Sequence, residues 1–250
     1  MTKRVLIAGA TGGIGQACAH LYASQGYSLM LTGRDQVKLD SLQQNLTDTY
    51  SVQVETAILD VNQIDDFKPA FMQVQKRLSG LDVLVNCAGS LYESSLMTSK
   101  IEDIQQQLQQ HLTSSILLAQ FASRFMARNK TGGSLVFISS VVAMQGSPGQ
   151  SVYACAKSGL LGLTKSLAKE LGSQQIRINL VEPGFIETPL VKHYSQEKRA
   201  QIASQTCLKR LGKAQDVAEL IGFLTSDAAS YITGQSFAVD GGLTLSNGSS

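Results

Sequence analysis

The stretch Arg4–Gly15, with the sequence RVLIAGATGGIG, decides the fold of this 250-residue chain. Its first five residues form a short, mostly apolar run, which is typical of a parallel strand that is covered on both faces. The glycines between Gly9 and Gly15 permit a tight turn, and a helical pattern then continues to about Gln25. This order of strand, turn and helix predicts the first unit of a sheet whose strands are joined by helices.

The same alternation continues along the whole chain. Runs that predict six further strands lie at 27–32, 52–59, 81–85, 134–138, 177–181 and 236–239. Between them, helices are predicted up to Asp48 and over 63–78, 100–127, 150–171 and 215–224, with a polar loop-and-helix region at 182–210. Because right-handed crossovers place helices on both faces of a parallel sheet, we expect an α/β fold. Specifically, the pattern predicts a single Rossmann-type, doubly wound domain with a seven-stranded, mostly parallel sheet over residues 1–245, followed by a flexible tail at 246–250.

Composition excludes several classes of protein. Hydrophobic residues make up 43% of the chain and charged residues 16%, and the net charge of +2 is spread without a run of like charges. We therefore expect an ordinary globular protein that binds neither nucleic acid nor membrane. The four cysteines are widely spaced and form no C-x-x-C pair. This spacing predicts reduced, mostly buried thiols in a cytoplasmic protein, with no metal site.

Polar residues and glycines follow most of the predicted strands, and ligands of such sheets bind at the carboxyl ends of the strands. Tyr153 and Lys157 lie four residues apart on the helix predicted to begin near Gln150, so both side chains face the same way. At roughly 5 Å, an ammonium stabilises a phenolate by about 3 kcal/mol, or about 2.4 pKa units, at an effective dielectric constant of about 20. The pair predicts a tyrosine general acid with a lowered pKa, although on its own it also fits an ordinary amphipathic helix.

Taken together and in order, the motifs resemble the short-chain dehydrogenase/reductase family over essentially the whole chain. The motifs that carry this resemblance are Gly9-x-x-x-Gly13-x-Gly15, Asn86-Cys-Ala-Gly89, Ser140, Tyr153-x-x-x-Lys157, Pro183-Gly184 and Asp240-Gly241-Gly242. The resemblance implies an NAD(P)-binding site that includes Tyr153 and Lys157. Its other residues would be the turn residues Gly9, Thr11, Gly13, Ile14 and Gly15, the adenine-contacting Asp60 and Val61, the floor residues Asn86, Ala88 and Gly89, and the carboxamide-holding Pro183, Gly184, Ile186 and Thr188.

The preferred cofactor depends on the end of the second strand. Members of the family that use NAD place an acidic residue there, whereas this chain has Gly33 followed by Arg34. A guanidinium can bind a 2′-phosphate with two hydrogen bonds, so Arg34 favours NADP(H). Gly12 is an observation against this preference, because relatives that use NADP often have Arg or Lys at that position.

The resemblance also implies catalytic roles. Ser140 would hydrogen-bond the substrate oxygen, Tyr153 would donate a proton to it, and Lys157 would lower the tyrosine pKa and bind the nicotinamide ribose. The fourth catalytic residue is usually an Asn that holds a water for proton relay, but here the stretch reads His111-Leu-Thr-Ser114. A neutral imidazole can bind water and ordinarily titrates near neutral pH, so His111 could keep the relay. The alternative is reduced or lost activity, with His111 packed as a helix-stabilising residue.

Within the family, the motifs most closely resemble 3-oxoacyl-[acyl-carrier-protein] reductases of fatty-acid synthesis. That resemblance implies a ketone or thioester-linked ketone as substrate, an acyl-carrier protein as partner, a homotetramer, and a substrate-covering segment at 185–210. Basic residues of this segment, among them Lys192, could attract an acidic carrier, or could simply form a solvated surface. Two alternatives stay open: an NADPH-dependent reductase of a free ketone, quinone or sugar, and a weakly active nucleotide-binding partner subunit.

Overall fold

A computed structural model describes residues 2–191 and 194–245 of the chain. Its centre is a sheet with the strand order β3-β2-β1-β4-β5-β6-β9, in which every described pairing is parallel. The doubly wound, seven-stranded fold predicted from the sequence is therefore confirmed. The strands are β1 (Arg4–Ala8), β2 (Ser28–Gly33), β3 (Val54–Ile58), β4 (Val83–Asn86), β5 (Gly133–Ile138), β6 (Ile176–Pro183) and β9 (Ser236–Val239).

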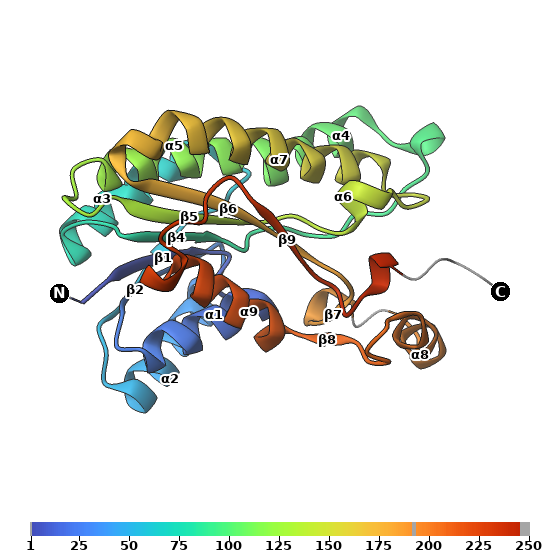
Figure 1. The fold of residues 1–250 in the computed structure, drawn as a ribbon, viewed down its shortest axis with the longest axis horizontal. Coiled ribbons are helices and arrows are strands. Elements are labelled where there is room, and N and C mark those ends of the chain that lie inside the picture. Colours follow the sequence, from blue (N-terminus) through green and yellow to red (C-terminus); the bar gives the residue numbers. More distant parts are fainter. Residues whose placement is uncertain (1, 192–193, 246–250) are drawn as a thin grey trace.

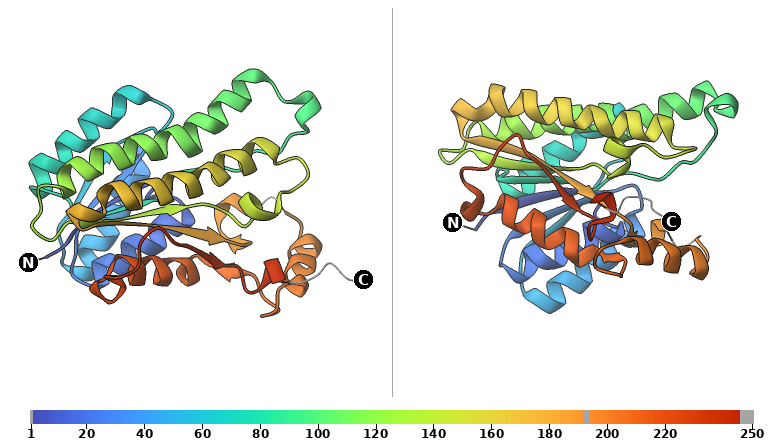
Figure 2. Two further views of the ribbon diagram at one scale, coloured as in Figure 1. Left: turned by 45° about the horizontal axis from the view of Figure 1, so that its top comes forward. Right: turned by 45° about the vertical axis from the view of Figure 1, so that its right-hand side comes forward.

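Helices cover both faces of the sheet (Figure 1). One face carries α1 (Gly13–Ser24), α2 (Gln36–Tyr50) and α9 (Ala214–Thr225). The other carries α3 (Phe67–Leu78), α5 (Ser114–Met126) and α7 (Ser151–Leu171), which lie side by side (Figure 2, left). The strand side chains alternate between two separate hydrophobic cores, one under each layer. This explains why the strands read as continuous apolar runs rather than as alternating patterns.

The strand order reverses between β1 and β4, and the turns after these two strands pack against each other. Gly9, directly after β1, has a φ of +73°, and a Cβ atom there would lie 2.6 Å from the Ala88 Cα. Only glycine combines this backbone conformation with such a close approach. The crevice at this reversal is the usual ligand site of open α/β sheets, so the fold itself positions a binding site at the β1 and β4 turns.

The helix predicted over 100–127 is interrupted. The structure has α4 (Ile101–Leu108), a π-helix at Gln109–Thr113, and then α5. Directly after the π-helix, the Ser114 and Ser115 hydroxyls donate to the Gln110 and His111 carbonyls at 2.6 and 2.7 Å. Side-chain hydrogen bonds of this kind compete with the regular helix ladder, and wide turns of this kind are frequent at functional sites.

Smaller elements extend beyond the carboxyl edge of the sheet. They include the short helix α6 (Val142–Gln145), the helix α8 (Gln196–Gln205), and a two-stranded sheet of β7 (Ile186–Glu187) and β8 (Gly212–Lys213). The sequence pattern predicted a loop-and-helix region here but not the small sheet. The predicted tail at 246–250 and Lys192 lie outside the described residues.

One expectation about the cysteines needs correction. All four cysteines are free, but only Cys18 is buried, while Cys155 and Cys207 are exposed. The prediction of mostly buried thiols was therefore wrong, because α7 turns the Cys155 face away from the sheet.

No helix within residues 2–191 and 194–245 is both long and apolar enough to cross a membrane.

Candidate active site

A cleft at the carboxyl edge of the sheet brings together eleven of the predicted site residues. It lies where the β1 and β4 turns meet the end of β5 and the start of α7. Cys87, Ser90, Ile138, Ser139 and Val191, to which no role was predicted in the site, complete its wall. The predicted residues that line it are Ile14, Ala88, Gly89, His111, Ser140, Tyr153, Lys157, Pro183, Gly184, Ile186 and Thr188.

Lys157 is the most firmly held residue of the cleft. It is only 5% exposed, and its ammonium donates to the Ile138 carbonyl at 2.7 Å. In return, the Ser139 hydroxyl donates to the Lys157 carbonyl at 3.1 Å. These two bonds fix α7 to the end of β5, so the role of Ser139 is structural. Burial disfavours the charged amine and lowers the pKa of Lys157 to about 8, so near neutral pH the side chain is still mostly charged.

Tyr153 lies beside Lys157, as helical spacing predicts, but its acidity differs from the prediction. The Lys157 ammonium is 5.7 Å from the centre of the Tyr153 ring. Burial raises the pKa of Tyr153 to about 12, and a hydrogen bond with the Ser140 hydroxyl lowers it only in part. The expectation that Lys157 brings the tyrosine pKa close to neutral was wrong, because the cost of burying a phenolate outweighs the attraction of the amine. Tyr153 is therefore a protonated phenol.

His111 lies inside the same cleft, on the π-helix. Its ring packs edge-on against the Tyr153 ring, with 5.1 Å between the centroids, and a Cβ atom at Gly89 would come within 3.1 Å of its Nδ1. The side chain is 2% exposed, and neither ring nitrogen has a hydrogen-bond partner among the described residues. Burial, assisted by the charge of Lys157, lowers the pKa of His111 to about 2. The near-neutral titration expected for this residue was therefore wrong: the imidazole stays neutral.

Asn86 shapes the turn after β4, and its side chain is not part of the described cleft lining. Its amide oxygen accepts from the Ala88 backbone at 3.1 Å, and its amide nitrogen donates to the Ser115 hydroxyl at 3.0 Å. Since Ser115 in turn donates to the His111 carbonyl, one chain of hydrogen bonds joins the turn to the π-helix. Asn86 thus fixes the relative positions of Ala88 and His111.

The glycine turn has the shape that a dinucleotide requires. Gly15 packs so closely that a Cβ atom would lie 2.3 Å from the Gly9 carbonyl oxygen, and at Gly13 it would lie 2.6 Å from the Thr188 side chain. The start of α1 therefore faces the cleft with backbone N–H groups and no side-chain bulk. Helix starts of this kind bind phosphate groups, so the residues present fit an NAD(P) cofactor.

The remaining predicted cofactor residues lie along the same edge. Thr11 is close to Gly33 at the end of β2, and the exposed Arg34 that follows makes no ion pair or hydrogen bond to any described residue. Asp60 caps its own turn by accepting from the Asn62 backbone at 3.0 Å. The buried Val61 accepts from Gln109 at 3.2 Å, which ties this turn to the π-helix.

A second, more apolar pocket opens from Ser140 and Tyr153 toward α8. Its wall includes the side chains of the segment predicted to cover the substrate, among them Phe185, Tyr194 and Ile202. The loop after β4 contributes Glu93, and the residue before α7 contributes Gln150. No motif marks Glu93 in the sequence, and no role was predicted for Gln150; the packing of distant segments brings both into the site. The full lining is Leu91, Glu93, Ser140, Val141, Val142, Ser147, Gln150, Tyr153, Gly184, Phe185, Val191, Tyr194, Lys198, Ile202 and Leu243.

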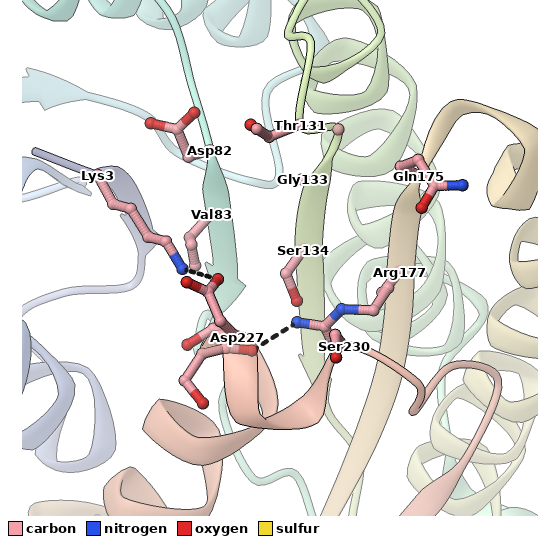
Figure 3. Close-up of a pocket in the computed structure, with 13 residues that line it drawn as sticks. Lys3, Asp82, Val83, Thr131, Gly133, Ser134, Gln175, Arg177, Asp227 and Ser230 are labelled. Atoms are coloured by element: carbon pink, nitrogen blue, oxygen red, sulfur yellow. Dashed lines mark hydrogen bonds and ion pairs between the residues drawn. The ribbon is translucent and has the colours of Figure 1, made fainter. Parts of the chain in front are cut away.

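Figure 3 shows a pocket at the opposite edge, near the amino ends of β4, β5 and β6. Its cations already have partners: Lys3 pairs with Asp227 at 2.6 Å, and Arg177 donates to the Leu224 and Ser226 carbonyls at 2.7 and 3.2 Å. These contacts hold the end of α9 to the sheet. None of the predicted site residues lines this pocket, so its role is structural.

Fold and site together define a class of protein. The cleft lies at the switch point of a doubly wound sheet, next to a glycine turn and to Ser140, Tyr153 and Lys157. This arrangement defines a short-chain oxidoreductase that acts on CH–OH donors. A family model described as enoyl-(acyl carrier protein) reductase matches residues 9–244. The chain belongs to the short-chain dehydrogenase/reductase family.

Individual relatives agree with this assignment. The chain is 37% identical to a 3-oxoacyl-[acyl-carrier-protein] reductase of Thermotoga maritima, over 97% of this chain and 98% of that protein. It is 34% identical to the structure of acetoin dehydrogenase YohF from Salmonella typhimurium, with a TM-score of 0.90 and 99% of both chains covered. The chain is 27% identical to the structure of YwfH, an NADPH-dependent reductase involved in bacilysin biosynthesis, with a TM-score of 0.92. The match covers 97% of this chain and 98% of YwfH.

Replacing His111 with Asn should make the protein less sensitive to acid. With a pKa of about 2 in the folded protein, against roughly 6.5 in the unfolded chain, the imidazole takes up a proton below pH 6.5 only on unfolding. Stability is therefore lost as the pH falls through this window, by up to about 1.4 kcal/mol per pH unit. Chemical denaturation at pH 7 and pH 5 should show the wild-type protein losing about 2 kcal/mol more than the variant. Equal losses would contradict a buried neutral imidazole.

Proposed function

We propose that the protein reduces 3-oxoacyl thioesters to 3-hydroxyacyl thioesters with NADPH, as in fatty-acid synthesis. The observation that carries this proposal is the cleft in which Ser140, Tyr153 and Lys157 meet, with a mostly apolar pocket opening beside the two hydroxyl groups. An acyl chain needs such a pocket, because its apolar surface gains free energy when it leaves water. The similarity to the 3-oxoacyl-[acyl-carrier-protein] reductase of Thermotoga maritima supports the substrate class.

In this proposal each side chain has one task. Bound NADPH would supply a hydride to the carbonyl carbon. Ser140 would donate a hydrogen bond to the carbonyl oxygen, and Tyr153 would donate its proton to that oxygen as negative charge develops there. Since burial keeps Tyr153 protonated, the acid is in the required form before the reaction. The charged Lys157, 5.7 Å from the ring, would stabilise the phenolate that the proton leaves behind.

His111 would return the proton. Its neutral ring touches Tyr153 and lies near Lys157. Neither ring nitrogen makes a hydrogen bond of regular geometry to a described residue, and the Ser90 backbone acts on the ring only weakly. A buried polar group normally has a hydrogen-bond partner, which indicates that a water binds here. A water held by His111 could pass a proton toward Lys157 without ionisation of the imidazole. This geometry favours the relay over the alternative of a residue that only stabilises its helix.

For the cofactor, we infer a preference for NADPH from Arg34. Its guanidinium has no ion-pair partner within the described residues and stands just after β2, beside the turn that holds Thr11. A free guanidinium at this edge can bind a 2′-phosphate. The similarity to YwfH, an NADPH-dependent reductase of the same fold, supports the inference.

Replacing Arg34 with Asp should reverse the cofactor preference. An aspartate would repel the 2′-phosphate and accept hydrogen bonds from a ribose 2′-hydroxyl. We expect the KM for NADPH to rise roughly 10- to 100-fold while the KM for NADH changes far less, since one charge-assisted contact is worth about 1.5–3 kcal/mol. Initial rates with the two cofactors provide the measurement, and Lys76→Asp, which makes the same change of charge at an exposed position near the end of α3, is the control. Equal effects on both cofactors would refute the role of Arg34.

A second candidate function is the reduction of a free ketone. The structural similarity to acetoin dehydrogenase YohF favours it, because the two chains match over nearly their full length. The cleft does not favour the third reading, a weakly active partner subunit, since Ser140, Tyr153 and Lys157 are all present and brought together.

A substrate panel tests the proposed function directly. NADPH oxidation should be fastest with acetoacetyl thioesters of carrier protein or coenzyme A, slower with free ketones, and absent with an enoyl thioester such as crotonyl-CoA. Tyr153→Phe should reduce kcat by at least roughly 100-fold, since general acid catalysis contributes about that much, with little change in NADPH binding. Faster turnover of small ketones than of every thioester would contradict the proposal, and retained kcat in Tyr153→Phe would show that another group supplies the proton.

Assembly and partners remain proposals. We infer a homotetramer from the family resemblance. Small residues on α7 would let helices of neighbouring subunits approach closely, although Ala156 is buried within the chain and Gly159 packs against Leu112. For an acyl-carrier protein, the positions that match the basic docking residues of similar enzymes hold Thr131 and Gln174, which counts against docking there. The exposed Arg128, Lys130 and Lys169 nearby offer positive charge at the ends of α5 and α7 instead. Docking to these residues and a cytoplasmic location stay predictions, as do the residue 1–245 domain limits and the covering role of residues 185–210.

A further inference from the structure

Glu93 is the acidic side chain in the wall of the pocket that opens from Ser140 and Tyr153. It lies in the loop after β4, and its Oε1 accepts two hydrogen bonds. One comes from the Gln150 amide at 2.5 Å and the other from the Tyr194 hydroxyl at 2.7 Å. Burial and the neighbouring Glu93 carboxylate raise the pKa of Tyr194 to about 12, so its phenol remains a donor.

These bonds fix the carboxylate relative to the reacting groups. Gln150 directly precedes α7, three residues before Tyr153, and it is buried. The Glu93 carboxylate is therefore tied to the same helix start that carries the catalytic phenol. Tyr194, from the segment after β7, holds it from the other side and packs edge-on against Phe185, with 5.3 Å between the ring centroids.

The second carboxylate oxygen is still able to accept a hydrogen bond. A carboxylate offers about four acceptor sites, and the bonds from Gln150 and Tyr194 use only Oε1. No described residue donates to Oε2, and Glu93 is exposed as a residue, so a ligand in the pocket can reach it. Gln150 Oε1 also lacks a partner within the described chain. Among the described lining residues, Lys198 is the one cation, and it donates to Gln201 at 3.3 Å rather than to Glu93.

We propose that Glu93 is a specificity-determining residue that selects ketones carrying an N–H or O–H donor a few bonds from the reacting carbonyl. Because its two hydrogen bonds hold the carboxylate in place before a substrate arrives, a donor on the substrate gains a charge-assisted hydrogen bond at little ordering cost. Two kinds of substrate present this chemistry: a thioester with an amide N–H in its arm, as in pantetheine, and a hydroxy ketone. The thioester case rests on the proposed function, whereas the hydroxy ketone case does not.

Matched substrate pairs test this proposal. For thioesters, the N-acetylcysteamine thioester of acetoacetate carries an N–H, and S-butyl acetothioacetate does not. For free ketones, 1-hydroxy-2-butanone carries an O–H in place of a methyl group of 3-pentanone. We expect wild-type kcat/KM to favour the donor-bearing member in at least one pair. Glu93→Ala should reduce that preference roughly tenfold, because a hydrogen bond to a charged group is lost, and should leave the donor-free member nearly unchanged.

Two further variants separate this role from a purely structural one. Tyr194→Phe removes one bond to Glu93 but keeps the carboxylate, so the substrate preference should persist. Glu93→Gln keeps the shape of the side chain and should lose part of the preference, with NADPH binding intact. Equal losses on both members of each pair, or no loss at all, would overturn the proposal. A Glu93-dependent preference for the hydroxy ketone, with no turnover of any thioester, would support the role of Glu93 while refuting the proposed function.

Discussion

The site depends on one buried amine that is tied to the end of a strand. Lys157 donates to the Ile138 carbonyl, and Ser139 donates back to the Lys157 carbonyl, so the start of α7 cannot shift relative to β5. Helical spacing then places Tyr153 one turn earlier on the same face. Through these two bonds, the parallel sheet decides where the phenol and the amine stand, and the crevice between β1 and β4 lies directly in front of them.

Burial, more than the attraction between charges, controls how this site titrates. It raises the pKa of Tyr153 to about 12 and lowers the pKa values of Lys157 and His111 to about 8 and about 2. Each shift favours the neutral form of the group, as expected where water is excluded. The consequence is a cleft that holds a protonated acid, a mostly charged amine and a neutral imidazole near pH 7. Such a set can deliver a proton to a developing alkoxide, which is a stronger base than phenolate.

Sequence patterns predict the parts of this structure that depend on local chemistry. Apolar runs placed all seven strands of the sheet to within a few residues, and the breakers before Gln150 placed the start of α7 almost to the residue. The π-helix was not predicted, because its wider hydrogen-bond register leaves no periodic signal in the sequence. It lies directly before Ser114 and Ser115, whose hydroxyls compete for helix carbonyls. Glu93 escaped because its partners, Gln150 and Tyr194, are distant in sequence. The pKa of Tyr153 was mispredicted because sequence spacing gives the charge separation but not the depth of burial.

The most direct test of this account is the pKa of Tyr153 in the cofactor-free protein. Tyrosine labelled with ¹³C at Cζ would report ionisation by NMR, and the Tyr153→Phe variant would assign its signal. If burial controls the pKa, the phenol stays protonated through neutral and mildly alkaline pH, with a pKa of about 12. A pKa of about 7 or 8 would show that Lys157 outweighs burial, and would contradict the claim that exclusion of water sets the protonation state of the site.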